Sequence, residues 1–126
     1  MKIAVTIARI LLALVFLFFG SNGFLHFLKA TMPPGLAGQF VGAMFQSHYI
    51  FVVSGIQVIG GALLLVNLYV PFALTILAPV IVNILLFHLL LLPVGWQPGV
   101  IAAILWIFLF IQYRQYFTGI FVQRAS

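Results

Sequence analysis

The chain alternates four long apolar stretches with shorter polar segments that contain proline and glycine. A run of about 20 apolar residues is enough for a helix to cross the hydrocarbon core of a bilayer. The pattern therefore predicts an all-α integral membrane protein, a four-helix bundle formed by a single domain over residues 1–126. We place the membrane-spanning helices at about residues 3–27, 49–68, 71–92 and 99–122.

The longest connection, residues 28–48, is too polar and too interrupted by proline and glycine to cross a membrane. Within it, apolar residues such as Leu36, Phe40 and Met44 recur at near-helical spacing. This spacing predicts a short amphipathic helix that lies on the membrane surface or over the mouth of the bundle.

Two prolines fall at the start of the third predicted span and inside it. Pro71 suits the first turn of a helix, where the N–H that proline lacks would have no partner. We expect Pro79, inside the span, to kink the helix and to leave the carbonyl of Thr75 without its usual hydrogen bond.

Acidic residues are absent from the chain, whereas 66% of its residues are hydrophobic and only 4% are charged. A soluble domain carries roughly 25% charged residues, so this composition indicates that lipid is the solvent. Without aspartate, glutamate or cysteine, the chain cannot form a Ser-His-Asp triad, a carboxylate pair or a thiolate metal site. We therefore assign no catalytic residues and no metal site, and we do not expect the isolated chain to be an enzyme.

The basic residues are distributed unevenly between the two ends of the predicted spans. Lys2, Arg9, Arg114 and Arg124 lie on the side of the chain termini, and only Lys29 lies on the other side. The positive-inside bias then places both termini in the cytoplasm, which in a bacterial host means the inner membrane. The net charge of +5 favours anionic lipid headgroups, but it is too sparse for a nucleic-acid-binding surface.

Five polar residues fall at similar depth in the outer half of the predicted bundle and are candidates for a ligand site: Asn22, His26, Gln57, Asn83 and His88. Polar side chains inside a membrane either serve a function or form hydrogen bonds between helices. Asn22 and His26 share one helical face because they are four residues apart. Asn83 and His88 are about 140° apart around their helix, so they cannot both point at one spot.

A structural role is the alternative for two of these residues. Gln57 shares a helical face with Ser54 and Gly61, and such a stripe of small residues is typical of a close helix contact. Asn83 shares a face with Pro79, so its amide could instead satisfy backbone groups freed by the kink.

Arg9 and Arg114 have no acidic partner anywhere in the chain. Their guanidinium groups could snorkel to lipid phosphates, bond to backbone carbonyls, bind an anionic ligand or pair with the carboxylates of a partner protein. We therefore treat both arginines as candidate contacts for lipid or for an acidic protein partner.

Five short segments occur in a particular order along the first three spans: 8–12 (ARILL), 18–20 (FFG), 60–65 (GGALLL), 77–83 (LAPVIVN) and 87–88 (FH). In this order and spacing, nearly the whole chain resembles the DoxX-like family of small four-helix membrane proteins. Many members carry a glutamate ahead of the glycine pair, where this chain has Gln57 and so lacks a protonatable group. The resemblance implies a link to membrane redox systems, because some relatives take part in quinone-reducing thiosulfate oxidation and others belong to oxidative-stress complexes.

The leading hypothesis is an accessory subunit of a membrane redox system, whose bundle binds a quinone-like or other apolar ligand in its outer half. Such a ligand needs an apolar cleft with a few oriented polar groups. One alternative is a purely structural or assembly protein, as a single copy or a homo-oligomer, that docks an acidic partner through Arg9 or Arg114. The other is a b-type haem protein with His26 and His88 as axial ligands.

Overall fold

The computed structural model describes residues 2–25 and 33–121, and over these residues it is all-α, with five α-helices and no strand. The helices are α1 (Lys2–Leu25), α2 (Gly35–Gln46), α3 (Tyr49–Val66), α4 (Val70–Leu86) and α5 (Gln97–Gln112). A π-helical turn, η1 (Phe87–Leu91), continues α4, and two 3-10 turns, η2 (Arg114–Tyr116) and η3 (Thr118–Phe121), follow α5. The all-α prediction is confirmed.

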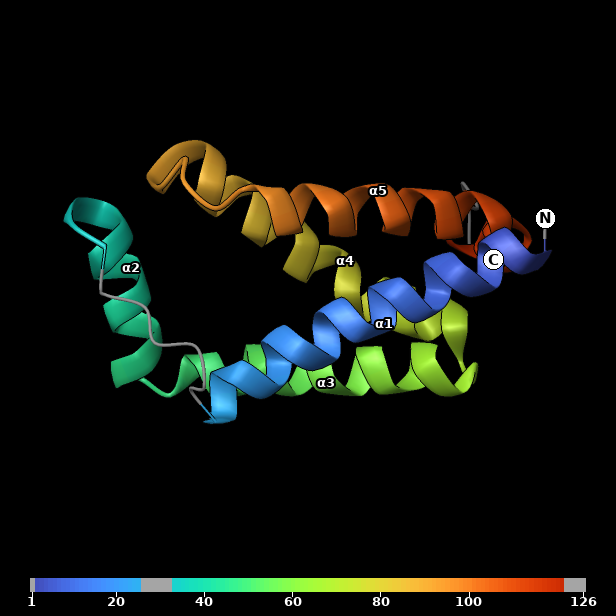
Figure 1. Cartoon of the computed structure of the whole chain (residues 1–126), viewed down its shortest axis with the longest axis horizontal. Helices are drawn as coiled ribbons and strands as arrows, with labels where there is room; N and C mark the ends of the chain where they lie inside the picture. The colour runs from blue at the N-terminus through green and yellow to red at the C-terminus, as the bar shows by residue number, and fades with distance from the viewer. Residues whose placement is uncertain (1, 26–32, 122–126) are drawn as a thin grey trace.

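Four of the helices pack side by side. α1 lies against α3 and α5, and α4 lies against the same two helices. In Figure 1, the start of α1 and the end of α5 lie at one end of this group. The core between the helices contains six large, fully buried side chains, namely Leu12, Phe16, Leu64, Leu74, Leu77 and Leu109.

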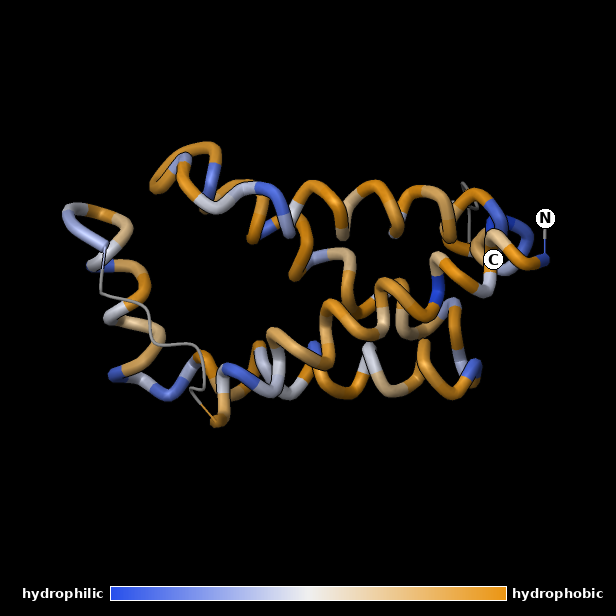
Figure 2. The backbone as a smooth tube through the Cα atoms, viewed as in Figure 1, coloured by the Kyte–Doolittle hydropathy of each residue, from blue (hydrophilic) through white to orange (hydrophobic). Residues whose placement is uncertain are grey.

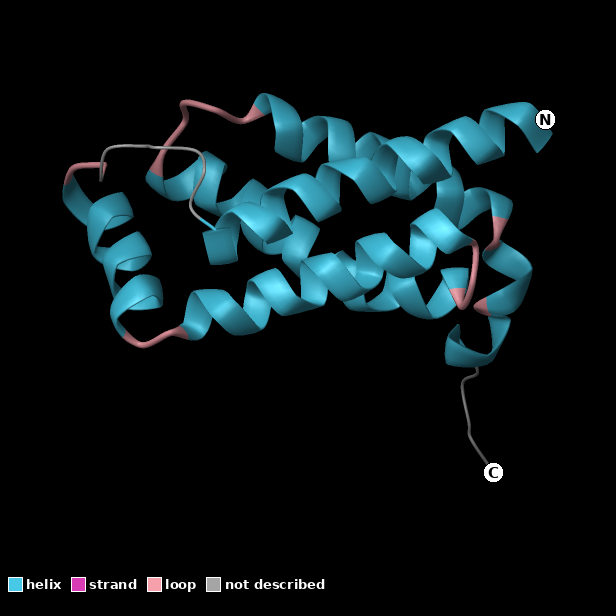
Figure 3. Ribbon diagram, turned by 60° about the horizontal axis from the view of Figure 1, so that its bottom comes forward, coloured by secondary structure: helices cyan, strands magenta, loops and turns pink. Residues whose placement is uncertain are grey.

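Helix α2 lies across the opposite end of the molecule (Figure 1), and the turned view in Figure 3 shows the same crosswise position. It confirms the short helix predicted within residues 28–48. α2 contacts α3 and η1, and its Phe40 packs edge-on against Phe87 of η1 with 5.6 Å between ring centroids. These contacts hold α2 over the ends of α3 and α4.

Three helices are long and apolar enough to cross a membrane: α1, α3, and α4 together with η1. Large apolar side chains are also exposed at mid-helix positions; Val52 and Ile104, for example, are both 62% exposed. Figure 2 shows hydrophobic residues along most of each long helix and polar residues mainly near the helix ends. Helices that are apolar on all sides are typical of membrane spans, so these features indicate an integral membrane protein.

The prediction of one helix over residues 99–122 is wrong at its C-terminal end. α5 stops at Gln112, and its 16 residues rise only about 24 Å. The helix ends where the polar cluster 112–116 interrupts the apolar pattern. There, Nη1 of Arg114 donates a hydrogen bond to the carbonyl of Ile111 at 2.8 Å, which satisfies one of the last carbonyls of the helix.

Candidate functional site

Helices α1 and α3 approach closely where small residues face each other. A Cβ atom added at Gly23 would lie 1.8 Å from Oγ of Ser54, and one added at Gly20 would lie 2.9 Å from Cβ of Gln57. One added at Gly61 would lie 3.0 Å from the backbone carbonyl oxygen of Ala13 in α1. The small-residue stripe predicted along Ser54, Gln57 and Gly61 is thus confirmed as a close helix contact.

Gln57 lies near the middle of α3 with its Cβ against Gly20, and only 9% of the residue is exposed. Among the described residues, no hydrogen bond reaches its side chain, and no polar side-chain atom there is fully enclosed without a partner. The side-chain amide of Gln57 therefore keeps some accessible surface. A ligand group that reaches this amide would gain a hydrogen bond worth about 0.5–1.5 kcal/mol.

Asn22 lies beside the same contact, half-buried on α1 and next to Gly23. His26, its predicted companion on that helical face, lies outside the described residues. The shared site for Asn22 and His26 therefore stays a prediction.

Asn83 is engaged with its own helix. Its Nδ2 donates a hydrogen bond to the carbonyl of Pro79 at 2.8 Å, and the residue is exposed. The acceptor is the carbonyl of Pro79 and not that of Thr75, which the proline was expected to free. Asn83 thus has the kind of backbone-satisfying role that was the structural alternative for it.

His88 belongs to the π-helical turn η1 and is half-buried. Its Nδ1 donates a hydrogen bond to the carbonyl of Leu92 at 3.0 Å, and its ring lies beside that of Phe87, with centroids 5.2 Å apart. A neutral imidazole with a proton on Nδ1 keeps Nε2 as an acceptor. His88 therefore links the end of η1 to the following loop.

Arg9 reaches from α1 to the C-terminal end of α3. Its Nη1 donates hydrogen bonds to the carbonyls of Leu64 and Leu65, the second at 3.1 Å. The last four carbonyls of a helix lack intrahelical partners, and a cation at this end is also favoured by the helix dipole. Arg114, in η2, similarly bonds to the carbonyl of Ile111 near the end of α5. Among the four kinds of partner considered for the two arginines, the structure shows backbone carbonyls for both of them.

A polar pocket lies beside Arg9, and the sequence did not predict it. Lys2, Thr6 and Arg9 share one face of α1 because their spacing is four and then three residues, and this signal is present in the sequence. Asn67 and Tyr113 join them from other parts of the chain, which only the packing of the helices determines.

The described residues contain no group of three or more histidine, cysteine or acidic side chains that could hold a metal ion. Comparison of the chain with protein-family models, curated proteins and solved structures found no match. The DoxX-like resemblance therefore rests on the five sequence segments alone.

Proposed function

We propose that the chain is a DoxX-like membrane protein that crosses the bilayer four times with both termini in the cytoplasm. α5 is apolar and packs against α1 and α4, which supports a role as the fourth span. Its short length can be met by local thinning of the bilayer. Lys2, Arg9 and Arg114 near one end of the molecule support a cytoplasmic position for that end, in a bacterium at the inner membrane.

The absence of cysteine from the chain makes this topology directly testable, because a single introduced cysteine is then the one thiol of the chain that a maleimide can label. Gln97 and Gln115 are both exposed and lie at the start of α5 and just beyond its end. A membrane-impermeant maleimide added to intact cells should label Gln97→Cys and spare Gln115→Cys. Labelling of Gln115→Cys alone would reverse the orientation, and equal labelling of both would show that α5 does not separate them.

We further propose that the protein is an accessory subunit of a membrane redox system and binds a quinone-like ligand in the half of the bundle nearer α2. The observation that carries this proposal is the side-chain amide of Gln57, a largely buried residue at the α1–α3 contact, which has no hydrogen-bond partner among the described residues. The amide N–H can donate to a ligand carbonyl, and the surrounding apolar side chains suit a lipophilic ring. Asn22, half-buried on the facing helix, is a second candidate contact.

Ligand binding tests this role. We expect a short-chain ubiquinone or menaquinone analogue to bind the purified protein and to bind Gln57→Leu about tenfold more weakly, the equivalent of about 1.4 kcal/mol. Asn83→Leu is the matched control, because the amide of Asn83 is exposed and already bonded to Pro79. Equal affinity of the wild type and Gln57→Leu would overturn the proposal.

The alternatives have less support. Docking of an acidic partner has no observation of its own in its favour, because the described hydrogen bonds of Arg9 and Arg114 go to backbone carbonyls. A bis-histidine haem site would require His88 and His26 to face one haem, and no observation supports this pair because His26 lies outside the described residues.

A further inference from the structure

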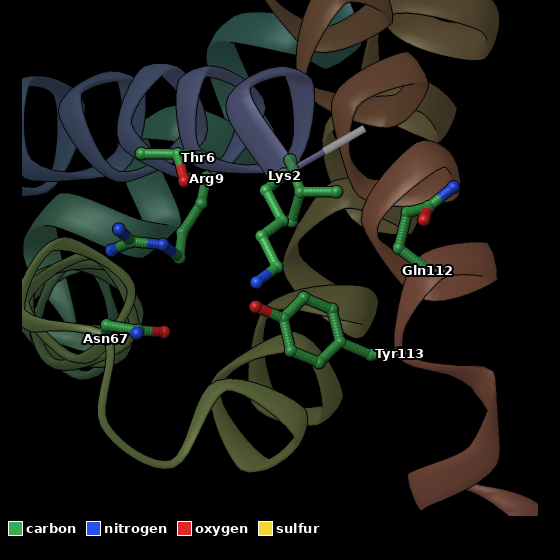
Figure 4. A pocket seen from close by; sticks show the side chains of 7 residues that line it. Lys2, Thr6, Arg9, Asn67, Gln112 and Tyr113 are labelled. Atoms are coloured by element: carbon green, nitrogen blue, oxygen red, sulfur yellow. The ribbon is translucent and has the colours of Figure 1, made fainter.

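A second polar feature lies at the end of the molecule where α1 begins and α5 ends. It is an open pocket with a volume of about 390 Å³. Its lining residues come from α1, from the residue after α3 and from the end of α5, and are Lys2, Val5, Thr6, Arg9, Asn67, Gln112 and Tyr113. Figure 4 shows the side chains of Lys2 and Tyr113 pointing toward one another and Arg9 extending toward Asn67.

The pocket is positively charged, and no acidic side chain of the chain can neutralise it. Lys2 and Arg9 line it, and the sequence contains no aspartate or glutamate that could neutralise them. The partial negative charge of the helix end of α3 offsets about half a unit of charge. The pocket therefore stays positive and favours an anion.

Arg9 is fixed in place and still has unused donors. Its Nη1 donates to the carbonyls of Leu64 and Leu65, which holds the guanidinium against α3. A guanidinium carries five N–H donors, and within the described part of the chain Nε and Nη2 of Arg9 make no hydrogen bond. A planar group with free N–H donors suits the oxygens of a phosphate.

Neutral donors complete the lining. The hydroxyl groups of Thr6 and Tyr113 and the amide of Asn67 can each donate one further hydrogen bond to an anion's oxygens. Together with Lys2 and Arg9, they form the mixture of charged and neutral donors that phosphate sites commonly use.

We propose that this pocket binds a phosphate group through Lys2 and Arg9. If the helices span a membrane, the start of α1 and the end of α5 lie at the headgroup layer, where phosphates of anionic phospholipids are concentrated. The half-buried Val5 at the pocket would lie next to the first carbons of an acyl chain. We therefore expect the phosphate to belong to a lipid headgroup. The site is separate from the Gln57 contact, so either proposal can fail without the other.

The test is native mass spectrometry of the full chain in a mild detergent with added palmitoyl-oleoyl phosphatidylglycerol, and in a second arm with inorganic phosphate. Lys2 is exposed, so Lys2→Gln should fold normally, and we expect it to bind the lipid about fivefold more weakly. Arg114→Gln is the matched control, because it removes one charge near the same end without lining the pocket, and we expect less than about a twofold change.

Each outcome decides the proposal. Lipid binding that depends on Lys2 and persists in millimolar inorganic phosphate supports a headgroup site. Displacement of the lipid by inorganic phosphate, with the same dependence on Lys2, supports the site and assigns it to free phosphate. Equal binding by the wild type and Lys2→Gln, or an equal loss in Arg114→Gln, would overturn it.

Discussion

Nη1 of Arg9 donates a hydrogen bond to the backbone carbonyl of Leu65, 3.1 Å away on the last turn of α3. The same nitrogen also bonds to the carbonyl of Leu64. These bonds join α1 to a segment more than fifty residues later in the chain. They also explain how an arginine is stabilised in a protein without acidic residues, because carbonyls at a helix end carry partial negative charge.

Replacing Arg9 by methionine should destabilise the protein by about 1.5–3 kcal/mol, because hydrogen bonds from a charged donor are lost between two helices. Thermal unfolding in detergent, followed by circular dichroism, measures the effect. Arg114→Met is the control, since Arg114 is exposed and its hydrogen bond goes to the adjacent last turn of α5 and joins no second span; we expect a loss below about 1 kcal/mol. Similar losses in both variants would mean that Arg9 does not join α1 to α3.

The α1–α3 contact should not tolerate a methyl group at Gly23. Its Cβ would lie 1.8 Å from Oγ of Ser54, so we expect Gly23→Ala to cost about 1–3 kcal/mol of unfolding free energy. Gly55→Ala is the control, because nothing lies within 4 Å of that position, and it should stabilise α3 by about 0.5–1 kcal/mol.

A second substitution checks the cause of the Gly23 effect. Adding Ser54→Gly to Gly23→Ala removes the clashing side chain and should restore part of the lost stability. If Gly23→Ala is as stable as Gly55→Ala, the helices are further apart at this position than the structure has them.

A tryptophan joins α5 to α4. Nε1 of Trp106 donates a hydrogen bond to the carbonyl of Leu74 at 2.8 Å, and Trp106→Phe should lower the unfolding free energy by about 1 kcal/mol. The other tryptophan of the chain, Trp96, is exposed, so Trp96→Phe is the matched control and should have little effect. Equal stability of the two variants would argue against the α4–α5 bond.

The paths of α3 and α4 could be predicted because each is a long apolar run, and because residues 67–71 mark the turn between them. The end of α5 could not be predicted, since apolar residues resume after the polar cluster. Phe117 is 5% exposed and packs on Phe110, with 4.8 Å between ring centroids. The chain must turn back through η2 to make this contact, and hydrophobic periodicity alone does not show such a reversal.

The candidate sites also include features that the sequence could predict and features that it could not. The stripe through Gln57 could be predicted because its small neighbours recur at helical spacing on one helix. The acceptors of Arg9 and Asn83 could not, because a sequence does not show whether a polar group bonds to its own helix or to another. The pocket beside Arg9 depends on where α1 crosses the ends of α3 and α5, which is a property of the packed structure.

The carbonyl stretching frequency of a bound quinone tests the proposed role of Gln57 most directly. A hydrogen bond from the amide lowers the frequency of the carbonyl that accepts it, and infrared difference spectra of an isotope-labelled quinone can resolve that band. In Gln57→Leu we expect the band to return to the frequency of a carbonyl without a hydrogen bond, while Asn83→Leu leaves it unchanged. The same frequency in the wild type and Gln57→Leu would contradict a ligand held by Gln57.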